Sequence, residues 1–203
     1  MTLRDRQAEQ ARRLILRAAI DLFLEKGYVG TTMDDIAARA VVARRTLYNQ
    51  FGSKAALLIA AINDRVVGAD ERSQASDQRA VRELDRPDEI IGAFVRSHVG
   101  VARRSLPILE VTYEAAAVDE EVATEYERNE ERRYQAQQLL VQILSEKGLL
   151  RTDVSIDYLK RGFWLLAGPP MLIAATRAGW SIDTYARWLE DTVTGLLIDR
   201  QQG

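Results

Sequence analysis

Apolar residues recur along this chain at the spacing of α-helices, with turn residues between the runs. Near the N-terminus, apolar pairs beginning with Leu14 and Ile15 repeat every four residues, and charged side chains fall between them. This pattern predicts one amphipathic helix that ends at Gly27. No segment alternates convincingly with the two-residue period of a half-buried strand. The pattern therefore predicts an all-α protein.

Two short helices and a longer one are predicted next. In "TTMDDIAARA", Thr31 or Thr32 can cap a helix whose first turn carries two aspartates. In "RRTLYNQF", Leu47 and Phe51 lie four residues apart and form an inward-facing pair. A glycine ends this piece, and Ser53 can cap the apolar helix that follows.

The rest of the chain has a helical pattern with less sharp boundaries. Pro87 and Pro107 are each typical of a helix start. The polar stretch Gly68 to Arg86 fits either a frayed helix end or a loop. Gly168-Pro169-Pro170 removes two backbone donors inside the longest apolar run, and this predicts a break that either lines a cavity or joins two helices.

Composition excludes several kinds of site. The 203 residues include no cysteine and one histidine, which excludes disulfides, thiolate metal sites and cysteine nucleophiles and leaves a histidine zinc site without partners. We therefore expect no metal and no cofactor. The N-terminus lacks the apolar core of a secretory signal. The longest apolar run, Gly162 to Ala175, is shorter than the roughly 20 residues of a membrane span. We expect a cytoplasmic protein with no membrane partner.

Charge is divided unevenly along the chain, although the net charge is only −2. Residues 1–54 carry ten lysines and arginines against six aspartates and glutamates, whereas residues 55–203 carry 18 against 24. A basic module on an acidic body is the electrostatic pattern of a nucleic-acid-binding protein.

The helices of the basic module fit a helix-turn-helix, in which a short third helix follows the second after a tight turn. The third helix has to be short to enter a major groove about 12 Å wide. Leu47 and Phe51 would hold it to the module. The residues left on its other faces are Arg44, Arg45, Tyr48 and Asn49. Arginine can read guanine, and tyrosine or lysine can hold phosphates.

The stretch "GYVGTTMDDIAARAVVARRTLYNQFGSKAALL" resembles the DNA-binding signature of the TetR family of transcription repressors. Its glycines, threonines, Leu-Tyr-x-x-Phe core and Ser-Lys start keep the family's register from roughly Arg12 to Ile62. The resemblance implies a helix-turn-helix DNA-binding domain at residues 1–54. It also implies a larger helical domain at residues 55–203 that binds a ligand and dimerises.

The resemblance also implies individual roles in DNA binding. Thr32 would cap the second helix and approach a phosphate, Tyr48 would contact the DNA backbone, and Lys54 would meet a phosphate. The residues implied to face the groove are Arg44, Arg45, Thr46 and Asn49. Two-fold pairing would place two recognition helices about 34 to 36 Å apart, so double-stranded DNA with a palindromic operator is the expected partner.

Two residues depart from the family pattern. Members commonly have glycine where Val41 stands and a capping serine or threonine where Ala43 stands. A β-branched valine resists the left-handed conformation of a turn glycine. We therefore expect the turn to close by another geometry, with a tilted or looser third helix. The missing cap should cost that helix on the order of 1 kcal/mol.

For the acidic body, the resemblance implies a small-molecule effector, partly apolar, and a homodimer formed through the last two helices. His98 would either bond the effector or be a half-buried histidine satisfied by a neighbour. The aromatic residues would either line a pocket or belong to the core. The candidate ligand-binding residues are Phe94, His98, Tyr113, Trp164 and Met171, with Trp180 as a further aromatic.

Other function classes have weaker support. A helical enzyme lacks a Ser/His/Asp set, and no carboxylate pair is set apart from the surface charges. A helical adaptor that binds an acidic protein surface would share the basic module. Preference for one duplex sequence over another distinguishes DNA reading from that alternative. The hypothesis that the sequence favours is a ligand-responsive transcriptional repressor.

Overall fold

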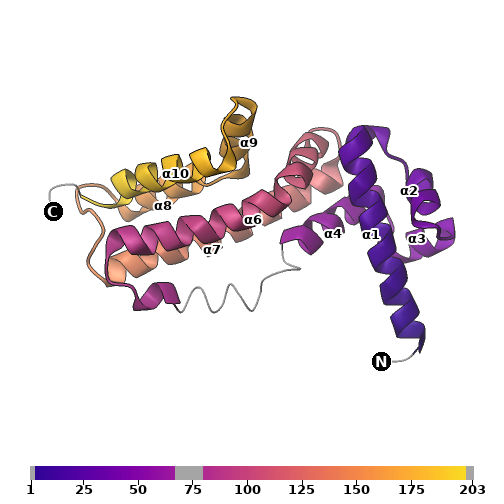
Figure 1. The fold of residues 1–203 in the computed structure, drawn as a ribbon, viewed down its shortest axis with the longest axis horizontal. Coiled ribbons are helices and arrows are strands. Elements are labelled where there is room, and N and C mark those ends of the chain that lie inside the picture. The colour runs from indigo at the N-terminus through magenta and orange to yellow at the C-terminus, as the bar shows by residue number, and fades with distance from the viewer. Residues whose placement is uncertain (1–2, 67–79, 200–203) are drawn as a thin grey trace. The chain divides into compact units, whose positions relative to one another are not determined.

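The chain is described by a computed structural model that covers residues 3–66 and 80–199 (Figure 1). Every regular element in these two ranges is a helix, which confirms the predicted fold class. The polar stretch that begins at Gly68 lies outside the described residues as far as residue 79. The helices are α1 (Leu3–Gly30), α2 (Met33–Ala40), α3 (Arg44–Phe51), α4 (Lys54–Val66), α6 (Pro87–Ala116), α7 (Glu120–Glu146), α8 (Ile156–Leu166), α9 (Pro169–Arg177) and α10 (Ile182–Leu197).

These helices form two compact units. The head unit contains α1 to α4, the part of α6 from Pro107 onward, and the part of α7 up to Arg128. The body unit contains the first part of α6, the rest of α7, and α8 to α10. Both units therefore include turns of α6 and α7. The division into domains at residues 54 and 55 stays a prediction. None of the described helices is both long enough and apolar enough to cross a membrane.

The head unit has its own apolar core. The inward residues predicted on α3, Leu47 and Phe51, are buried with 0% and 8% exposure, beside Phe23 of α1 and Ile36 of α2. Val122 from the first turns of α7 belongs to the same core. Burial of apolar side chains is the main source of stability for such short helices, because isolated helices of eight residues are marginal in water.

The body unit is built around a second core. Ile91 of α6, Leu144 of α7, Phe163 of α8 and Leu189 of α10 are all buried in it. Helices α8 and α10 run side by side (Figure 1), and a Cβ added at Gly162 of α8 would lie 3.0 Å from the Leu196 side chain of α10. The small residue therefore lets the two helices approach closely.

Two proline predictions had different outcomes. Pro87 begins α6 as expected, but the prediction that Pro107 begins another helix is wrong, because α6 continues through it. A proline removes one helical hydrogen bond and costs about 3 kcal/mol in a helix interior. Burial of Ala102 before it and Ile108 after it favours the helical path on both sides. The break predicted around Gly168 is confirmed as a junction, with Gly168 as the N-cap of α9.

Candidate nucleic-acid interface

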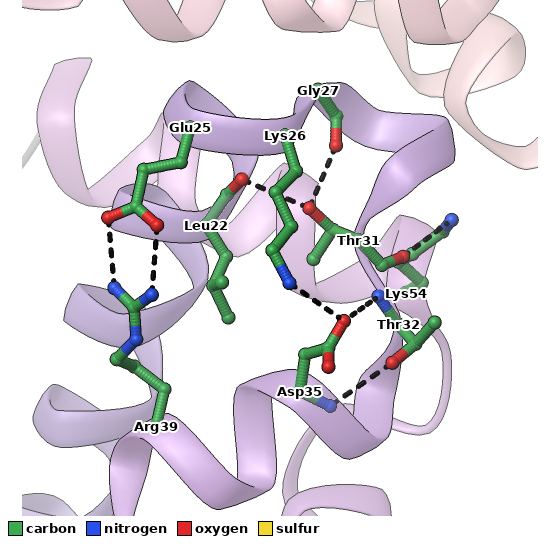
Figure 2. A network of polar contacts seen from close by, with 9 residues as sticks. All are labelled: Leu22, Glu25, Lys26, Gly27, Thr31, Thr32, Asp35, Arg39 and Lys54. Atoms are coloured by element: carbon green, nitrogen blue, oxygen red, sulfur yellow. Dashed lines mark hydrogen bonds and ion pairs between the residues drawn. The ribbon is translucent and has the colours of Figure 1, made fainter.

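The end of α1 is shaped by a glycine and closed by a threonine. Gly27 has φ 71° and ψ 173°, so the regular helix is interrupted where the sequence predicted its end. Thr31 is fully buried, and its hydroxyl oxygen lies 2.8 Å from the Gly27 carbonyl oxygen and 3.1 Å from that of Leu22 (Figure 2). Thr31 therefore adds a side-chain hydrogen bond to α1 at the point where the helix is interrupted.

Lys54 takes part in the same closure. Its Nζ donates to the carbonyl oxygens of Tyr28 at 2.8 Å and Thr31 at 3.1 Å, and it lies 4.2 Å from the centroid of the Tyr28 ring. The sequence predicted this ammonium at a DNA phosphate, whereas the structure places it on the end of α1 (Figure 2). An ammonium has three donors. The phosphate contact of Lys54 stays a prediction for the donor that these two bonds leave.

The start of α2 is fixed by a reciprocal pair of hydrogen bonds. Thr32 is the N-cap, and its hydroxyl accepts from the Asp35 backbone N–H at 3.1 Å, while the Asp35 carboxylate accepts from the Thr32 backbone N–H at 3.4 Å (Figure 2). The bond with the Thr32 hydroxyl is the first cause that lowers the pKa of Asp35. The predicted capping role of Thr32 is confirmed, and its phosphate contact stays a prediction.

Two exposed ion pairs join α1 to α2, and sequence reasoning missed both. Arg39 donates to both carboxylate oxygens of Glu25, at 3.0 and 2.8 Å, and Lys26 lies 3.4 Å from Asp35 (Figure 2). The hydrogen bond from Arg39 lowers the pKa of Glu25. The partners are 14 and 9 residues apart, so no helical spacing links them in the sequence. These pairs add to the buried apolar contacts that hold α2 against α1.

The turn between α2 and α3 corrects the expectation drawn from Val41. Val41 adopts the left-handed conformation, with φ 55° and ψ 46°, and no alternative geometry is used. Its N–H bonds to the Ala38 carbonyl at 3.2 Å, and the Val42 N–H bonds to the Ala37 carbonyl at 3.1 Å. This pair of bonds is the Schellman ending usually formed with glycine. Val41 is 90% exposed, so its side chain meets little that would oppose this conformation.

The N-terminus of α3 confirms the second departure. Ala43 is the N-cap and makes no side-chain hydrogen bond. Its carbonyl accepts from the N–H groups of Thr46 and Leu47 at 2.8 and 3.3 Å. The α3 helix therefore begins regularly but without the side-chain acceptor that a serine or threonine would add.

The outer surface of α3 carries the predicted DNA-binding side chains. Leu47 and Phe51 point into the head core, and the Phe51 ring also lies 4.9 Å from the Arg12 guanidinium carbon. Thr46 is half-buried. The exposed side chains of α3 are Arg44, Arg45, Tyr48 and Asn49. Their contacts with DNA stay predictions, but their common exposure on one short helix is a structural fact.

On this surface, Arg44 contacts two neighbouring side chains, whereas Arg45 forms no ion pair with a described residue. The Arg44 Nε lies 3.0 Å from an Asp34 carboxylate oxygen, and its guanidinium carbon lies 5.4 Å from the centroid of the Tyr48 ring. A hydrogen bond with Tyr48, followed by the charge of Asp34, raises the pKa of Arg44. No ion pair among the described residues involves Arg45. No helical spacing links Asp34 to Arg44, so the pairing of a predicted DNA-reading arginine with this aspartate could not be predicted.

The turn between α6 and α7 belongs to the head unit and contacts the helix-turn-helix. Tyr28 donates its hydroxyl proton to Asp119 at 2.6 Å, and Ser53 donates to Glu121, with oxygen distances of 3.1 and 2.9 Å. Burial first, and then the bond with Asp119, raises the pKa of Tyr28, and the same bond lowers the pKa of Asp119. Asp119 also accepts from two N–H groups at the start of α7. The bonded residues are 91 and 68 positions apart in the sequence, so sequence reasoning missed these contacts.

The predicted ligand-binding residues are divided between the units. Tyr113 is 47% exposed in the head unit, with its ring 6.1 Å from that of Tyr126. Phe94, His98, Trp164 and Met171 belong to the body unit. The Phe94 ring lies 5.8 Å from that of Phe163.

The other three body residues differ in exposure. His98 and Trp164 are half-buried, whereas Met171 is 37% exposed. The further aromatic, Trp180, is 39% exposed, and its ring lies 5.8 Å from the Trp188 ring. The ligand-binding role of every one of these residues stays a prediction.

Known proteins are similar to this chain in sequence and in fold. The family model described as bacterial regulatory proteins, tetR family, matches residues 15–61. The HTH-type transcriptional regulator YdeS of Bacillus subtilis (strain 168) is 32% identical over 155 residues, which make up 73% of this chain and 72% of YdeS. Its similarity therefore extends well beyond the helix-turn-helix.

Solved structures are similar in fold at lower identity. A transcriptional regulator from Saccharomonospora viridis in complex with choline has a TM-score of 0.72 at 21% identity, over 95% of this chain and 100% of that one. NalD, the secondary repressor of the MexAB-OprM multidrug efflux pump in Pseudomonas aeruginosa, has a TM-score of 0.71 at 22% identity, over 97% of this chain and 100% of NalD. These likenesses support an N-terminal helix-turn-helix followed by a larger helical part.

Proposed function

This chain belongs to the tetR family of bacterial regulatory proteins, and on that premise we propose that it is a ligand-responsive repressor of transcription. It binds a palindromic operator as a homodimer, and a small-molecule effector releases it. The family consists of transcriptional regulators, and NalD is a repressor. We place the protein in the cytoplasm, where its operator is.

The observation that carries this proposal is the exposed surface of α3. Two buried residues hold the helix, while Arg44, Arg45, Tyr48 and Asn49 are left at the surface. Arg45 is free to reach a guanine edge or a phosphate, because it has no ion pair with a described residue. Arg44 exchanges its contact with Asp34 for one with DNA. Thr32, the N-cap of α2, contributes a further phosphate contact.

The homodimer forms through apolar side chains left exposed on the helices of the body unit. On α8, Ile156, Tyr158 and Leu165 are 48%, 59% and 61% exposed. Helix α8 lies against α10, so these two helices form one surface. Large apolar side chains gathered at a surface favour association. Pairing through the C-terminal helices would remove these exposed apolar side chains from water.

The effector binds among the helices of the body unit, where four of the five candidate residues lie. The fold is compatible with chemically different ligands, since the Saccharomonospora viridis regulator was solved with choline and SmeT with triclosan. An effector acts only through its different affinities for the DNA-binding form and the released form. The ligand therefore has to be identified from the residues of this chain.

Selection of bound duplexes from a random DNA pool tests the DNA-binding part of the proposal. The expected result is enrichment of a two-fold-symmetric consensus. Gel-shift titrations on that consensus should then show weaker binding for Arg45→Ala and Arg44→Ala by roughly tenfold or more, and a smaller loss for Tyr48→Phe. Arg86→Ala is the matched control, because Arg86 is an exposed arginine of the body unit that also pairs with an aspartate.

Three outcomes would contradict the DNA-binding proposal. Equal affinity of all α3 variants and the parent would mean that α3 does not read the operator. Equal affinity for all duplexes would favour the adaptor alternative. Loss of affinity in Arg86→Ala as large as in Arg45→Ala would mean that charge alone, and not the surface of α3, governs binding.

A further inference from the structure

Side chains from three helices meet at the C-terminal end of α8 in the body unit. Pro169 and Pro170 have no N–H, and Gly168 donates to the Leu165 carbonyl, so the carbonyls of Trp164 and Leu166 need partners from elsewhere. Arg133 of α7 donates to the Trp164 carbonyl at 2.9 Å, and Tyr185 of α10 donates to the Leu166 carbonyl at 2.8 Å. His98 of α6 forms a hydrogen bond with the Ala167 backbone. This helix end is therefore a point where α6, α7 and α10 converge.

The charge of Arg133 is neutralised within the cluster. Its Nε and Nη2 donate to the two Glu130 carboxylate oxygens at 3.2 and 2.6 Å, and its Nη1 donates to the Gln137 Oε1 at 3.1 Å. The side chains of Arg133 and Glu130 are only 16% and 18% exposed. His98 is neutral at ordinary pH, because burial, together with the nearby charge of Arg133, lowers its pKa to about 4. The cluster therefore offers no unpaired charge.

Two hydrogen-bond donors remain unused next to Arg133. The Nε2 of Gln137 and the Nε1 of Trp164 are buried and have no hydrogen-bond partner. Gln137 is 5% exposed, and its amide orientation is set because Oε1 has to face the guanidinium donor. The Trp164 ring lies 4.9 Å from the guanidinium carbon of the same arginine. Buried donors in native proteins almost always have a partner, so these two donors are available to an acceptor.

We propose that the Gln137 amide and the Trp164 indole N–H bind the oxygen acceptors of an uncharged, mostly apolar effector in the body unit. This inference rests on the proposed function, since it assigns the chemistry of the effector. Two donors without charge suit carbonyl or ether oxygens. An unpaired arginine would favour an anion and an unpaired carboxylate would favour a cation, and the Arg133–Glu130 pair leaves neither in this cluster. Phe94 and Tyr134 add aromatic surface beside Phe163 and Trp164 for the apolar part.

The first test uses three probes that share a two-ring body and differ in their acceptors. 1,4-Naphthoquinone carries two neutral carbonyl oxygens, naphthalene carries none, and 1-naphthoate carries a charge. The chain has no cysteine, so the quinone cannot form a thiol adduct. Calorimetric titration of the full-length chain should give the quinone an affinity at least about tenfold above those of naphthalene and 1-naphthoate, as expected for one or two added hydrogen bonds.

The second test locates the bound probe. The chain has three tryptophans, so its nitrogen-15 spectrum contains three indole N–H signals, which single tryptophan-to-phenylalanine variants assign. Addition of the quinone should move the Trp164 signal and leave that of Trp180 in place. Because this measurement uses the unaltered protein, it does not depend on whether a variant folds.

Variants then test the two donors separately. Trp164→Phe keeps an aromatic ring without the N–H, and Gln137→Glu keeps the oxygen that accepts from Arg133 without the amide donor. Each should weaken quinone binding by about tenfold. The matched control is Gln135→Glu, since Gln135 is an exposed glutamine of the same helix. This control should bind the quinone as the parent does.

The site proposal is overturned if the quinone does not bind, if naphthalene or 1-naphthoate binds as tightly, or if the Trp164 signal does not move. These outcomes are independent of DNA. A gel shift with and without the quinone distinguishes the two proposals. Quinone binding at Trp164 without any change in operator affinity supports the site and contradicts its role as an effector site. Absence of any operator binding contradicts the proposed function whatever the quinone does.

Discussion

At the scale of single residues, Val41 adopts a left-handed backbone conformation that a β-branched residue disfavours. The turn needs a left-handed residue to end α2 and start α3, and the chain supplies a β-branched one. Such a residue costs about 1–2 kcal/mol in this conformation. The turn keeps its form because the Val42 side chain packs on the head core and two backbone hydrogen bonds close the helix end. Tertiary packing here outweighs a local preference.

We predict that Val41→Gly stabilises the protein by about 1 kcal/mol, because glycine adopts the left-handed conformation without strain. The exposed valine side chain loses little burial. Urea unfolding followed by circular dichroism measures the change. Val29→Gly is the control, since Val29 is also exposed but lies in the last turn of α1. That change should destabilise the protein by about 0.5 kcal/mol, because glycine relieves no strain there and adds freedom to the unfolded chain. Equal effects of the two substitutions would contradict the strain at Val41.

At the scale of elements, α3 depends on its neighbours more than on its own sequence. It has eight residues, two of them buried, and its N-cap is an alanine. Hydrogen bonds next to α3 hold the neighbouring helix ends. Thr31 and Lys54 bond to the end of α1, and the Thr32–Asp35 pair caps α2 (Figure 2). The presentation of Arg44 and Arg45 therefore rests on contacts made outside the recognition helix.

We predict that Ala43→Ser stabilises the protein by about 1 kcal/mol, because its hydroxyl can accept from a free N–H in the first turn of α3. Hydrogen exchange of the α3 amides should slow at the same time, while exchange in α10 stays unchanged. Ala38→Ser is the control, since Ala38 is exposed in the interior of α2 and serine there adds no cap. An increase in stability in the control, or none in Ala43→Ser, would contradict the missing-cap explanation.

At the scale of the whole molecule, α6 and α7 contribute to both units. Their junction contacts Tyr28 and Ser53 in the head unit, and later turns of α7 carry Glu130, Arg133 and Gln137 in the body unit. A ligand that binds to α7 thus acts on a helix whose first turn is bonded to the helix-turn-helix. This continuity gives an effector a physical route to the DNA-binding residues, which the proposed function requires.

The chain has one histidine, His98, and histidine is the side chain whose ordinary pKa lies between pH 5 and 7. His98 has a folded pKa of about 4, below the ordinary value of 6.5, so the unfolded chain binds a proton in this window and the folded chain does not. The stability from neutral His98 is present above pH 6.5 and is lost as the pH falls toward 4.

We predict that the free energy of unfolding decreases by roughly 2 kcal/mol from pH 7 to pH 5, as the difference between the two pKa values requires. Urea unfolding at a series of pH values measures it. In His98→Gln, which keeps a neutral donor without a titrating group, the free energy should stay nearly constant over this window. A parent profile as flat as that of the variant would show that His98 titrates normally.

Much of the fold could be predicted from the sequence, because helix signals are local. The 3.6-residue period, the cap at Thr32 and the break at Gly168 all appear where expected. Pro107 was misread because a proline pattern does not reveal the packing that lets a helix continue. The DNA-binding surface could be predicted from the inward pair on α3. The ion pairs around it could not, because their partners are distant in sequence.

The all-α fold, the helix-turn-helix and the exposed residues of α3 follow from local sequence patterns, because periodicity and turn residues act over a few positions. What those residues touch depends on how the helices pack. The tertiary structure paired Arg44 with Asp34, turned Lys54 onto the end of α1, and buried Gln137 and Trp164 beside an arginine that Glu130 neutralises. Such contacts depend on how helices pack, and packing joins residues whose distance along the chain carries no information about their distance in space.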